Sequence, residues 1–245
     1  MRTVTTLLCL SAISALAQPA APAAFEVASI KVGQPGRPSI EPGPSGLTMR
    51  SAPLSTCLGW AFDIQEPQIV GPNWLNEVGF DIFAKSAGPA TEAELRKMLQ
   101  TLLADRFKLA FHRETREIPA LILVVSGKGH KLIPADKPGD PSFRTGKMSL
   151  TAVGATLSEL TQLLSHELRE PIVDQTGLKG LFNYTLDINA YVTDEMRKSG
   201  NGPPLEANSI IAQAMQEQLG LKVEMKKTPI SMLIVEHLEK LPTEN

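Results

Sequence analysis

The segment TEAELRKMLQTLLADRFKLAFHRETREIPALILVV, residues 91–125, contains the order of elements on which the fold prediction rests. Thr91 and Glu94 form a capping box, which begins a helix by satisfying its free backbone N–H groups. The helix that follows has one apolar face, made of Leu95, Met98, Leu99, Leu102 and Leu103. Two stretches of β-forming residues come next, 107–115 and 118–125. Because only a few residues separate them, they predict an antiparallel hairpin.

The chain on either side repeats this order of elements. Before the helix we expect strands at 47–52 and 80–85, a helix from Pro53 to Asp63 between them, and a short extended piece at 69–72. After the hairpin we expect the corresponding series: a strand at 148–153, a helix capped by Thr156 and Glu159, an extended piece at 172–173, a strand at 180–187, a helix at 209–219, and a hairpin of 221–226 with 230–238.

Matching apolar positions indicate that the two series arose by internal duplication. Residues 69–71 align with 172–174, 80–83 with 182–185, 107–109 with 221–223, and 121–124 with 232–235. The fold class predicted is therefore α+β, with two tandem small modules at 47–127 and 148–245. Each module is expected to pack two helices on a mixed or antiparallel sheet, in the order strand-helix-strand-strand-helix-strand-strand. Residues 128–147 are expected to connect them.

The region before the first module is expected to contain little regular structure. Residues 18–24 form an Ala/Pro spacer without side chains that could build a core. Residues 25–30 alternate between apolar and polar, as in a half-buried strand. Residues 33–46 are rich in Gly and Pro and are predicted to be a loop.

Composition excludes two classes of protein. The 245 residues include 24 Lys and Arg against 26 Asp and Glu, a formal net charge of -2, and no basic run. Binding to nucleic acid requires a positive surface, so no nucleic-acid partner is expected. A hydrophobic content of 42% is too high for a disordered chain.

The first 17 residues have the pattern of a secretory signal peptide. A short positive start, Met1-Arg2, precedes an apolar stretch and the small-x-small sequence Ala15-Leu16-Ala17. The apolar stretch is about 13 residues long, whereas a membrane span needs about 20. We therefore expect cleavage after Ala17, no stable membrane anchor after its removal, and a periplasmic or extracellular location. Cys57 is then the only cysteine, and its place on an apolar helical stripe indicates burial.

Five strings in the chain resemble one family of exported bacterial proteins: FEVASIK (25–31), QIVGPNWL (68–75), MLQTLLADRFKLAFHRETREIPALIL (98–123), PIVDQTGLKGLFNYTLDI (171–188) and QEQLGLKVEMKKTPISMLIVEHLEKLPTEN (216–245). They are similar to the acidobacterial soil-associated family, whose function is unknown. In some relatives the domain is attached to a membrane metallopeptidase, but this chain has neither the membrane helices nor the metal motif of those relatives. Each half also resembles, in pattern only, the amino-terminal (STN-like) module of secretins and TonB receptors, which is an interaction and signalling unit.

No catalytic, cofactor-binding or metal-binding motif is complete. His166-Glu167 begins like H-E-x-x-H, but no second histidine follows one turn later. Cys57 and His112 could form a nucleophilic pair only if the fold brought them together. The glycine-rich residues 127–131 lack the spacing of a phosphate-binding loop and predict a turn. We therefore predict no catalytic, cofactor or metal residues.

Trp60 and Trp74 are the candidate interaction residues, because tryptophan is enriched in interfaces, although core packing explains them equally well. The function predicted is non-catalytic binding in the cell envelope, with a protein or peptide as partner. Sheet edges or the loops at 33–46 and 188–207 would make the contact. The alternative is a hydrolase whose site would gather His166, Glu167 or Cys57 with a second titratable group in a deep pocket.

Overall fold

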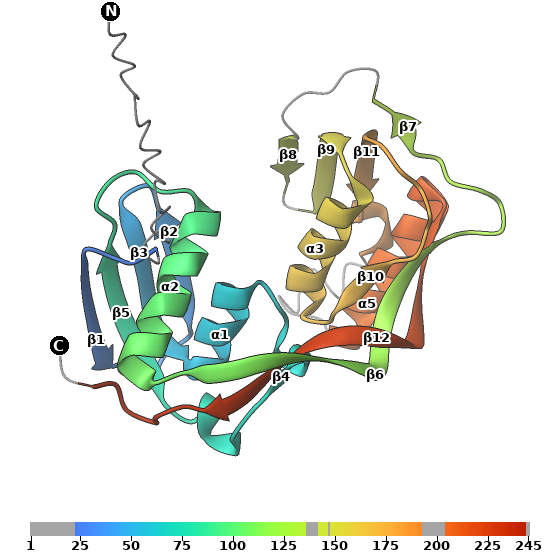
Figure 1. Ribbon diagram of the computed structural model, residues 1–245. Coiled ribbons are helices and arrows are strands. Elements are labelled where there is room, and N and C mark those ends of the chain that lie inside the picture. The colour runs from blue at the N-terminus through green and yellow to red at the C-terminus, as the bar shows by residue number, and fades with distance from the viewer. Residues whose placement is uncertain (1–22, 136–141, 147, 193–203, 244–245) are drawn as a thin grey trace, which may run out of the picture.

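Two lobes joined by a long two-stranded ribbon make up the protein in the computed structural model (Figure 1). The structure describes residues 23–135, 142–146, 148–192 and 204–243, with the backbone alone at 145 and 204–208. The predicted signal peptide, 1–17, lies outside these ranges. The mixed helix and strand content confirms the α+β class. None of the helices in the described ranges is long and apolar enough to cross a membrane.

Lobe 1, residues 23–109, is a four-stranded antiparallel sheet in the order β1-β5-β3-β2 with helices packed on it. Its strands are β1 (Val27–Val32), β2 (Ser39–Gly43), β3 (Gly46–Pro53) and β5 (Gly79–Lys85). Its helices are α1 (Leu54–Phe62), α2 (Glu92–Phe107) and the short 3₁₀ turns η1 (Glu66–Gln68) and η2 (Asn73–Asn76). The capping box of Thr91 and Glu94 is formed as predicted. The apolar face of α2 buries Leu99 and Leu103 in the core of this lobe.

Lobe 2, residues 126–220, repeats that strand order as β7-β11-β9-β8. Its strands are β7 (Ile133–Pro134), β8 (Ser142–Thr145), β9 (Ser149–Ala155) and β11 (Phe182–Asp187). Its helices are α3 (Leu157–Leu168), the 3₁₀ turn η3 (Asn189–Tyr191), α5 (Pro204–Ala214) and the π-helical η4 (Met215–Leu219). Thr156 and Glu159 cap α3 as predicted.

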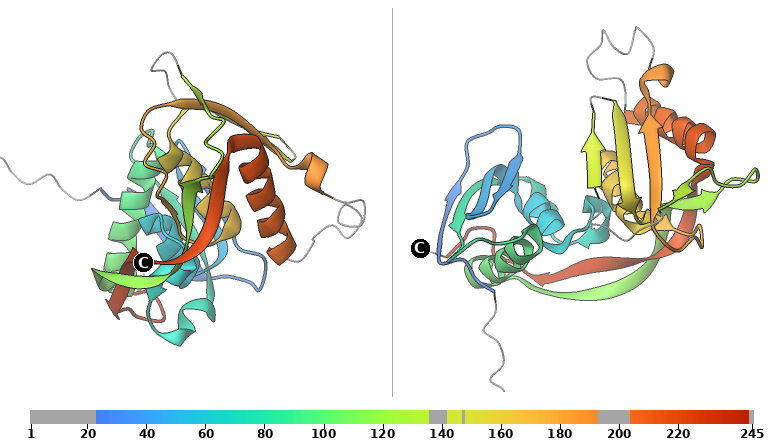
Figure 2. Two further views of the ribbon diagram at one scale, coloured as in Figure 1. Left: turned by 90° about the vertical axis from the view of Figure 1, so that its right-hand side faces the viewer. Right: turned by 90° about the horizontal axis from the view of Figure 1, so that it is seen from above.

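The third sheet belongs to both lobes. Its order is β10-β6-β12-β4, from strands β4 (Ile69–Val70), β6 (Ala110–Val125), β10 (Ile172–Asp174) and β12 (Leu221–His237). Strands β6 and β12 pair antiparallel over almost their whole length. Each strand starts in its own lobe and ends in the other: Leu123 of β6 lies in the core of lobe 2, and Leu233 of β12 lies in the core of lobe 1. Figure 2 shows this ribbon as a curved span that reaches both lobes.

The two hairpins predicted at 107–125 and 221–238 were therefore wrong, since each segment is one continuous strand. Consequently the two halves are not self-contained sheets. Pro119 and Pro229 look like strand breaks in the sequence, because proline lacks the N–H that a ladder needs. In the structure β10 pairs only with residues 121–123 and β4 only with residues 233–234. The ribbon is thus two-stranded at both prolines, and an edge tolerates proline.

The positions that match in these two long strands differ from the predicted alignment. Leu121 pairs in parallel with Ile172, and Leu233 pairs in parallel with Ile69. Leu121 therefore corresponds to Leu233, not to Met232. The helices before the two strands end in left-handed residues, Lys108 and Gly220, which likewise correspond. The predicted alignment was shifted because alternating apolar residues fit more than one register.

The two lobes share a β-bulge. The pairing of β3 with β5 is interrupted at Ser51, and the pairing of β9 with β11 is interrupted at Gly154; both residues have positive φ angles, 47° and 64°. The N–H of Ser51 donates to Asp81 Oδ1 at 2.8 Å, and the N–H of Gly154 donates to Asn183 Oδ1 at 2.8 Å. A side-chain oxygen thus satisfies the extra backbone donor in each half.

The predicted loop at 33–46 contains a strand. Residues 39–43 form β2, which pairs antiparallel with β3 and includes Pro42. β2 is an edge strand, so the missing N–H of Pro42 does not interrupt a second ladder. The strand expected at 25–30 is confirmed as β1, two residues further along the chain.

Candidate functional site

An open groove of about 440 Å³ lies between the lobes, where Asp63 at the end of α1 contacts side chains of α3. Both lobes and the centre of the ribbon contribute to its walls, and most of the side chains are polar: Asp63, Gln65 and Gln68 from lobe 1; Ser158, Thr161, Gln162, Ser165 and His166 from α3; Pro171, Ile172 and Val173 around β10; and Pro229, Ile230 and Ser231 from β12. Such a lining offers hydrogen bonds to a ligand that carries amide or hydroxyl groups.

Asp63 is the central polar residue of the groove. It ends α1 in a left-handed conformation, with φ 54°. Arg96 Nη1 lies 2.9 Å from its Oδ1, His166 Nε2 lies 3.2 Å from the same oxygen, and the Gln162 amide donates to Oδ2. The hydrogen bond from His166, followed by the charge of Arg96, lowers the pKa of Asp63, and partial burial opposes them. The carboxylate is therefore held in its charged form by groups from both lobes.

Arg96 fixes the position of Asp63 within lobe 1. Its guanidinium lies over the ring of Trp60 at 4.9 Å, donates to the Trp60 carbonyl at 2.5 Å and pairs with Glu92 at 2.7 Å. Only 16% of its side chain is exposed. A planar guanidinium with several partners is a rigid donor, so Asp63 faces a nearly fixed positive charge.

His166 uses both of its ring nitrogens inside the groove. Nε2 faces Asp63, and Nδ1 lies 3.5 Å from the side-chain nitrogen of Gln65. If the Gln65 amide donates to Nδ1, then Nε2 carries the proton that is shared with Asp63. The hydroxyl of the adjacent Ser165 accepts the N–H of Ile172 at 3.0 Å. The groove therefore brings a carboxylate and an imidazole together, but this arrangement does not aim a free imidazole nitrogen at a nucleophile.

The other candidate residues of the hydrolase hypothesis lie elsewhere. Cys57 is fully buried in the core of lobe 1, where burial raises the pKa of its thiol to about 12. His112 is on the ribbon, where it pairs with Glu236 at 2.7 Å. The structure does not bring Cys57 and His112 together, and Glu167 is exposed on α3 outside the groove lining. Across the described ranges, no group of three or more His, Cys, Asp or Glu residues could hold a metal ion.

The two predicted contact residues, Trp60 and Trp74, are both half-buried against the core of lobe 1. Trp60 lies on α1 beneath Arg96, and Trp74 lies in the turn η2. Their role in an interface remains a prediction. In the first of the two loops expected to bind, residues 33–36 and 38 line a second hollow of about 460 Å³ in lobe 1. Residues 193–203 of the other loop lie outside the described ranges.

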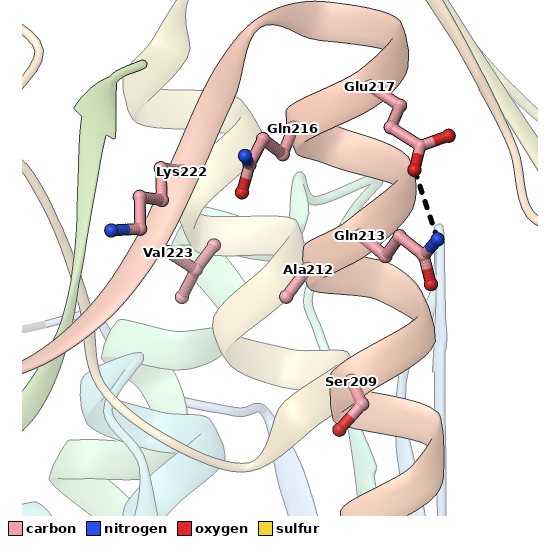
Figure 3. A pocket seen from close by; sticks show the side chains of 7 residues that line it. All are labelled: Ser209, Ala212, Gln213, Gln216, Glu217, Lys222 and Val223. Carbon is pink, nitrogen blue, oxygen red and sulfur yellow. Dashed lines mark hydrogen bonds between the residues drawn. The ribbon is translucent and has the colours of Figure 1, made fainter. Parts of the chain in front are cut away.

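A further hollow, of about 390 Å³, lies between α5 and β12 in lobe 2 (Figure 3). Its polar groups do not converge on a common point. Gln213 and Glu217 bond to each other at 3.0 Å on the side of the helix away from β12, and Lys222 points away from the helix. Lys222 also pairs with Glu224 at 2.7 Å. This hollow therefore makes a weaker candidate than the groove between the lobes.

One family model matches the chain, that of the protein of unknown function DUF3738, over residues 55–238. The chain belongs to the DUF3738 family. No curated protein and no solved structure matches it. The DUF3738 match begins in α1 and ends just beyond β12. It includes lobe 2, the ribbon and every residue that lines the groove, whereas strands β1, β2 and β3 of lobe 1 precede it.

Sequence reasoning missed Asp63, Gln162 and Arg96 as site residues. The repeated order of elements in the sequence contained a signal for Asp63. Asp63 follows the first residue of its helix, Leu54, by nine positions, and His166 follows Leu157 by nine positions. Two titratable residues at matched places in the two halves were a reason to examine them as a pair.

Proposed function

We propose that this DUF3738 protein is an exported, non-catalytic binding protein of the cell envelope, and that the groove between its lobes holds a peptide segment of an envelope protein. The observation that supports binding best is the groove itself, which is open, polar and lined by both lobes. The engagement of both His166 nitrogens favours binding over catalysis.

Export and the nature of the partner belong to this proposal. The signal-like residues 1–17 and the resemblance to exported proteins of soil bacteria support a periplasmic or extracellular location. The looser likeness of each half to the amino-terminal module of secretins and TonB receptors supports a protein or peptide as the ligand. Amide and hydroxyl side chains along α3 suit the backbone of a peptide, which carries a donor and an acceptor in each residue.

The groove is a better candidate than the sheet edges for this contact. Among the described residues, strand β1 lies at one edge of its sheet, but such an edge is a general property of open sheets. The groove adds side chains from three separate segments of the chain, which gives a ligand more points of recognition. Trp74 and the hollow beside residues 33–38 lie in lobe 1 and would serve as secondary contacts.

A hydrolase is the second candidate, favoured by one observation: the groove places His166 beside Asp63. A base of this kind needs a free nitrogen directed at a nucleophile or a water molecule. If the protein cleaves peptide or ester substrates and His166→Ala abolishes the cleavage, the hydrolase replaces the binding function.

Photo-crosslinking tests the binding function. A photoreactive residue at Ser158, which is exposed on α3 and lines the groove, should capture a segment of an envelope protein in an envelope extract. The same residue at Thr185, exposed on β11 and absent from the groove lining, is the matched control. The captured segment is then synthesised as a peptide, and its affinity for the purified protein is measured.

Two tryptophan variants give the decisive comparison. Ser158→Trp fills the groove and should weaken binding of the peptide at least about tenfold, since a blocked site loses its contacts. Thr185→Trp adds the same bulk outside the groove and should leave the affinity unchanged. Equal affinities for the two variants would exclude the groove as the binding site.

A further inference from the structure

Within the described ranges, two regions of contact join the lobes. One is the ribbon of β6 and β12, together with the apolar side chains of β4 and β10 that pack on it. The other is a small set of side-chain contacts, in which Asp63 meets Gln162 and His166, and Gln65 meets His166. This second set lies in the groove wall, so it bears directly on the width of the groove.

The ribbon is thin where it passes between the lobes. Its neighbours β10 and β4 pair only at 121–123 and 233–234, which leaves two strands between those places. Two-stranded β-structure is marginally stable alone and twists more than a wider sheet. Pro119 and Pro229 lie in this part of the ribbon. A small apolar cluster packs on this part of the ribbon: Ala120, Ile230 and Met232 with Val70 of β4 and Val173 of β10. The ribbon therefore holds the lobes together, and the side-chain contacts in the groove add to what sets their angle.

We propose that the contact of Asp63 with Gln162 and His166 is a latch that sets the width of the groove, with the ribbon as its hinge and Arg96 as the residue that positions Asp63. The regulatory role of this latch rests on the proposed function, because it controls access to the same groove. The latch itself is a property of the protein without its ligand.

The two sides of the latch differ in rigidity. On lobe 1, Asp63 is held by Arg96, which is mostly buried and fixed by Trp60 and Glu92. On lobe 2, Gln162 and His166 are exposed side chains of α3. They can release Asp63 without disturbing the core of either lobe, because exposed side chains change rotamer rapidly. The latch can therefore open by the loss of two side-chain contacts.

Electron–electron double resonance between spin labels tests the latch in the chain without residues 1–17 and without ligand. Labels at Lys85 on β5 and Thr185 on β11, both exposed, report the distance between the lobes. The fully buried Cys57 should not react with the label. We expect one narrow distance distribution for the otherwise unchanged protein.

The variant Gln162→Ala/His166→Ala removes the lobe 2 side of the latch and leaves the Asp63–Arg96 pair in place. We expect the ratio of closed to open molecules to fall at least about tenfold, because both hydrogen bonds to the charged Asp63 carboxylate are lost. The melting temperature should change little, because both side chains are exposed. Asp63→Asn is the second variant, since asparagine also tolerates the left-handed conformation.

The matched control is Glu167→Ala, an exposed change on the same helix outside the groove lining. It should keep the narrow distribution. The proposal would be overturned if the distance distribution stayed unchanged in both latch variants. It would also be overturned if the Glu167→Ala control broadened the distribution as much as the latch variants do. No ligand is present, so these outcomes are independent of the crosslinking result that tests the binding function.

Discussion

Asp63 and His166 occupy equivalent positions in the two halves of the chain, and their side chains meet across the groove at 3.2 Å. Each lies nine residues after the first residue of its helix and six before the following short strand, Ile69 or Ile172. The contact therefore joins matching positions of two similar segments, one of which carries an acidic residue and the other a basic residue.

The charge on Asp63 should make stability depend on pH on the acid side. The pKa of Asp63 is lowered in the folded protein, first by the hydrogen bond from His166 and then by Arg96. The charged carboxylate therefore stabilises the fold above the pKa of an unfolded aspartate, about 3.9. That contribution is lost as the pH falls through the lower folded pKa. Melting temperatures measured between about pH 2 and pH 7 should fall less steeply for Asp63→Asn than for the unchanged protein. If the melting temperatures of the two proteins fell equally with pH, Asp63 would not be the source of the acid-side pH dependence.

The repeated bulge predicts which substitutions lobe 1 accepts at residue 81. Lobe 2 already has Asn183 at this place, with the same 2.8 Å hydrogen bond to its bulge. Asp81→Asn should therefore leave the free energy of unfolding within about 0.5 kcal/mol of its original value. Asp81→Ala leaves the Ser51 N–H without its acceptor and should cost about 1–2 kcal/mol. Urea denaturation of both variants measures the difference, and equal losses would show that the bulge does not depend on this acceptor.

The two left-handed helix ends at Lys108 and Gly220 should respond oppositely to substitution. Lys108 has φ 52°, which glycine adopts more easily, so Lys108→Gly should be neutral or stabilise the fold by up to about 1 kcal/mol. A Cβ at Gly220 would lie 2.2 Å from the carbonyl oxygen of Gly129. Gly220→Ala should therefore destabilise the fold by about 2 kcal/mol or more. Guanidinium denaturation tests both changes; tolerance of alanine at Gly220 would contradict the close approach.

Cys57 should be inert in the folded protein. It is fully buried, and its raised pKa, about 12, leaves almost no thiolate at neutral pH. An aromatic disulfide reagent should react with it only after denaturant is added, at a rate set by unfolding. Rapid labelling under native conditions would show that the core of lobe 1 opens more readily than its packing indicates.

Local patterns predicted the helices well. The capping boxes at Thr91 and Thr156 and the apolar faces behind them are local signals, and both helices form where expected. The short pieces at Ile69 and Ile172 were also located correctly. These features depend on residues close in sequence, which a single chain displays directly.

The sequence alone did not predict which distant strands pair with each other. Residues 107–125 and 221–238 each fit a hairpin as well as half of a ribbon, because the alternation of side chains is the same in both. The structure distinguishes the ribbon from the hairpin by where the strand ends are buried: Leu123 lies in the core of lobe 2, and Leu233 lies in the core of lobe 1. The groove exists because each long strand leaves its own lobe and enters the other. The contact between Asp63 and Gln162 could therefore not be predicted from patterns along the sequence.

Hydrogen–deuterium exchange with the captured peptide tests the location of the binding site most directly. Binding in the groove predicts slower exchange at residues 158–173 and 229–231 when the peptide is present, because a bound ligand stabilises the segments it contacts. Strand β1, at the outer edge of lobe 1, should exchange as before. Protection confined to β1, with no change along α3 and the ribbon centre, would contradict the assignment of the groove as the binding site.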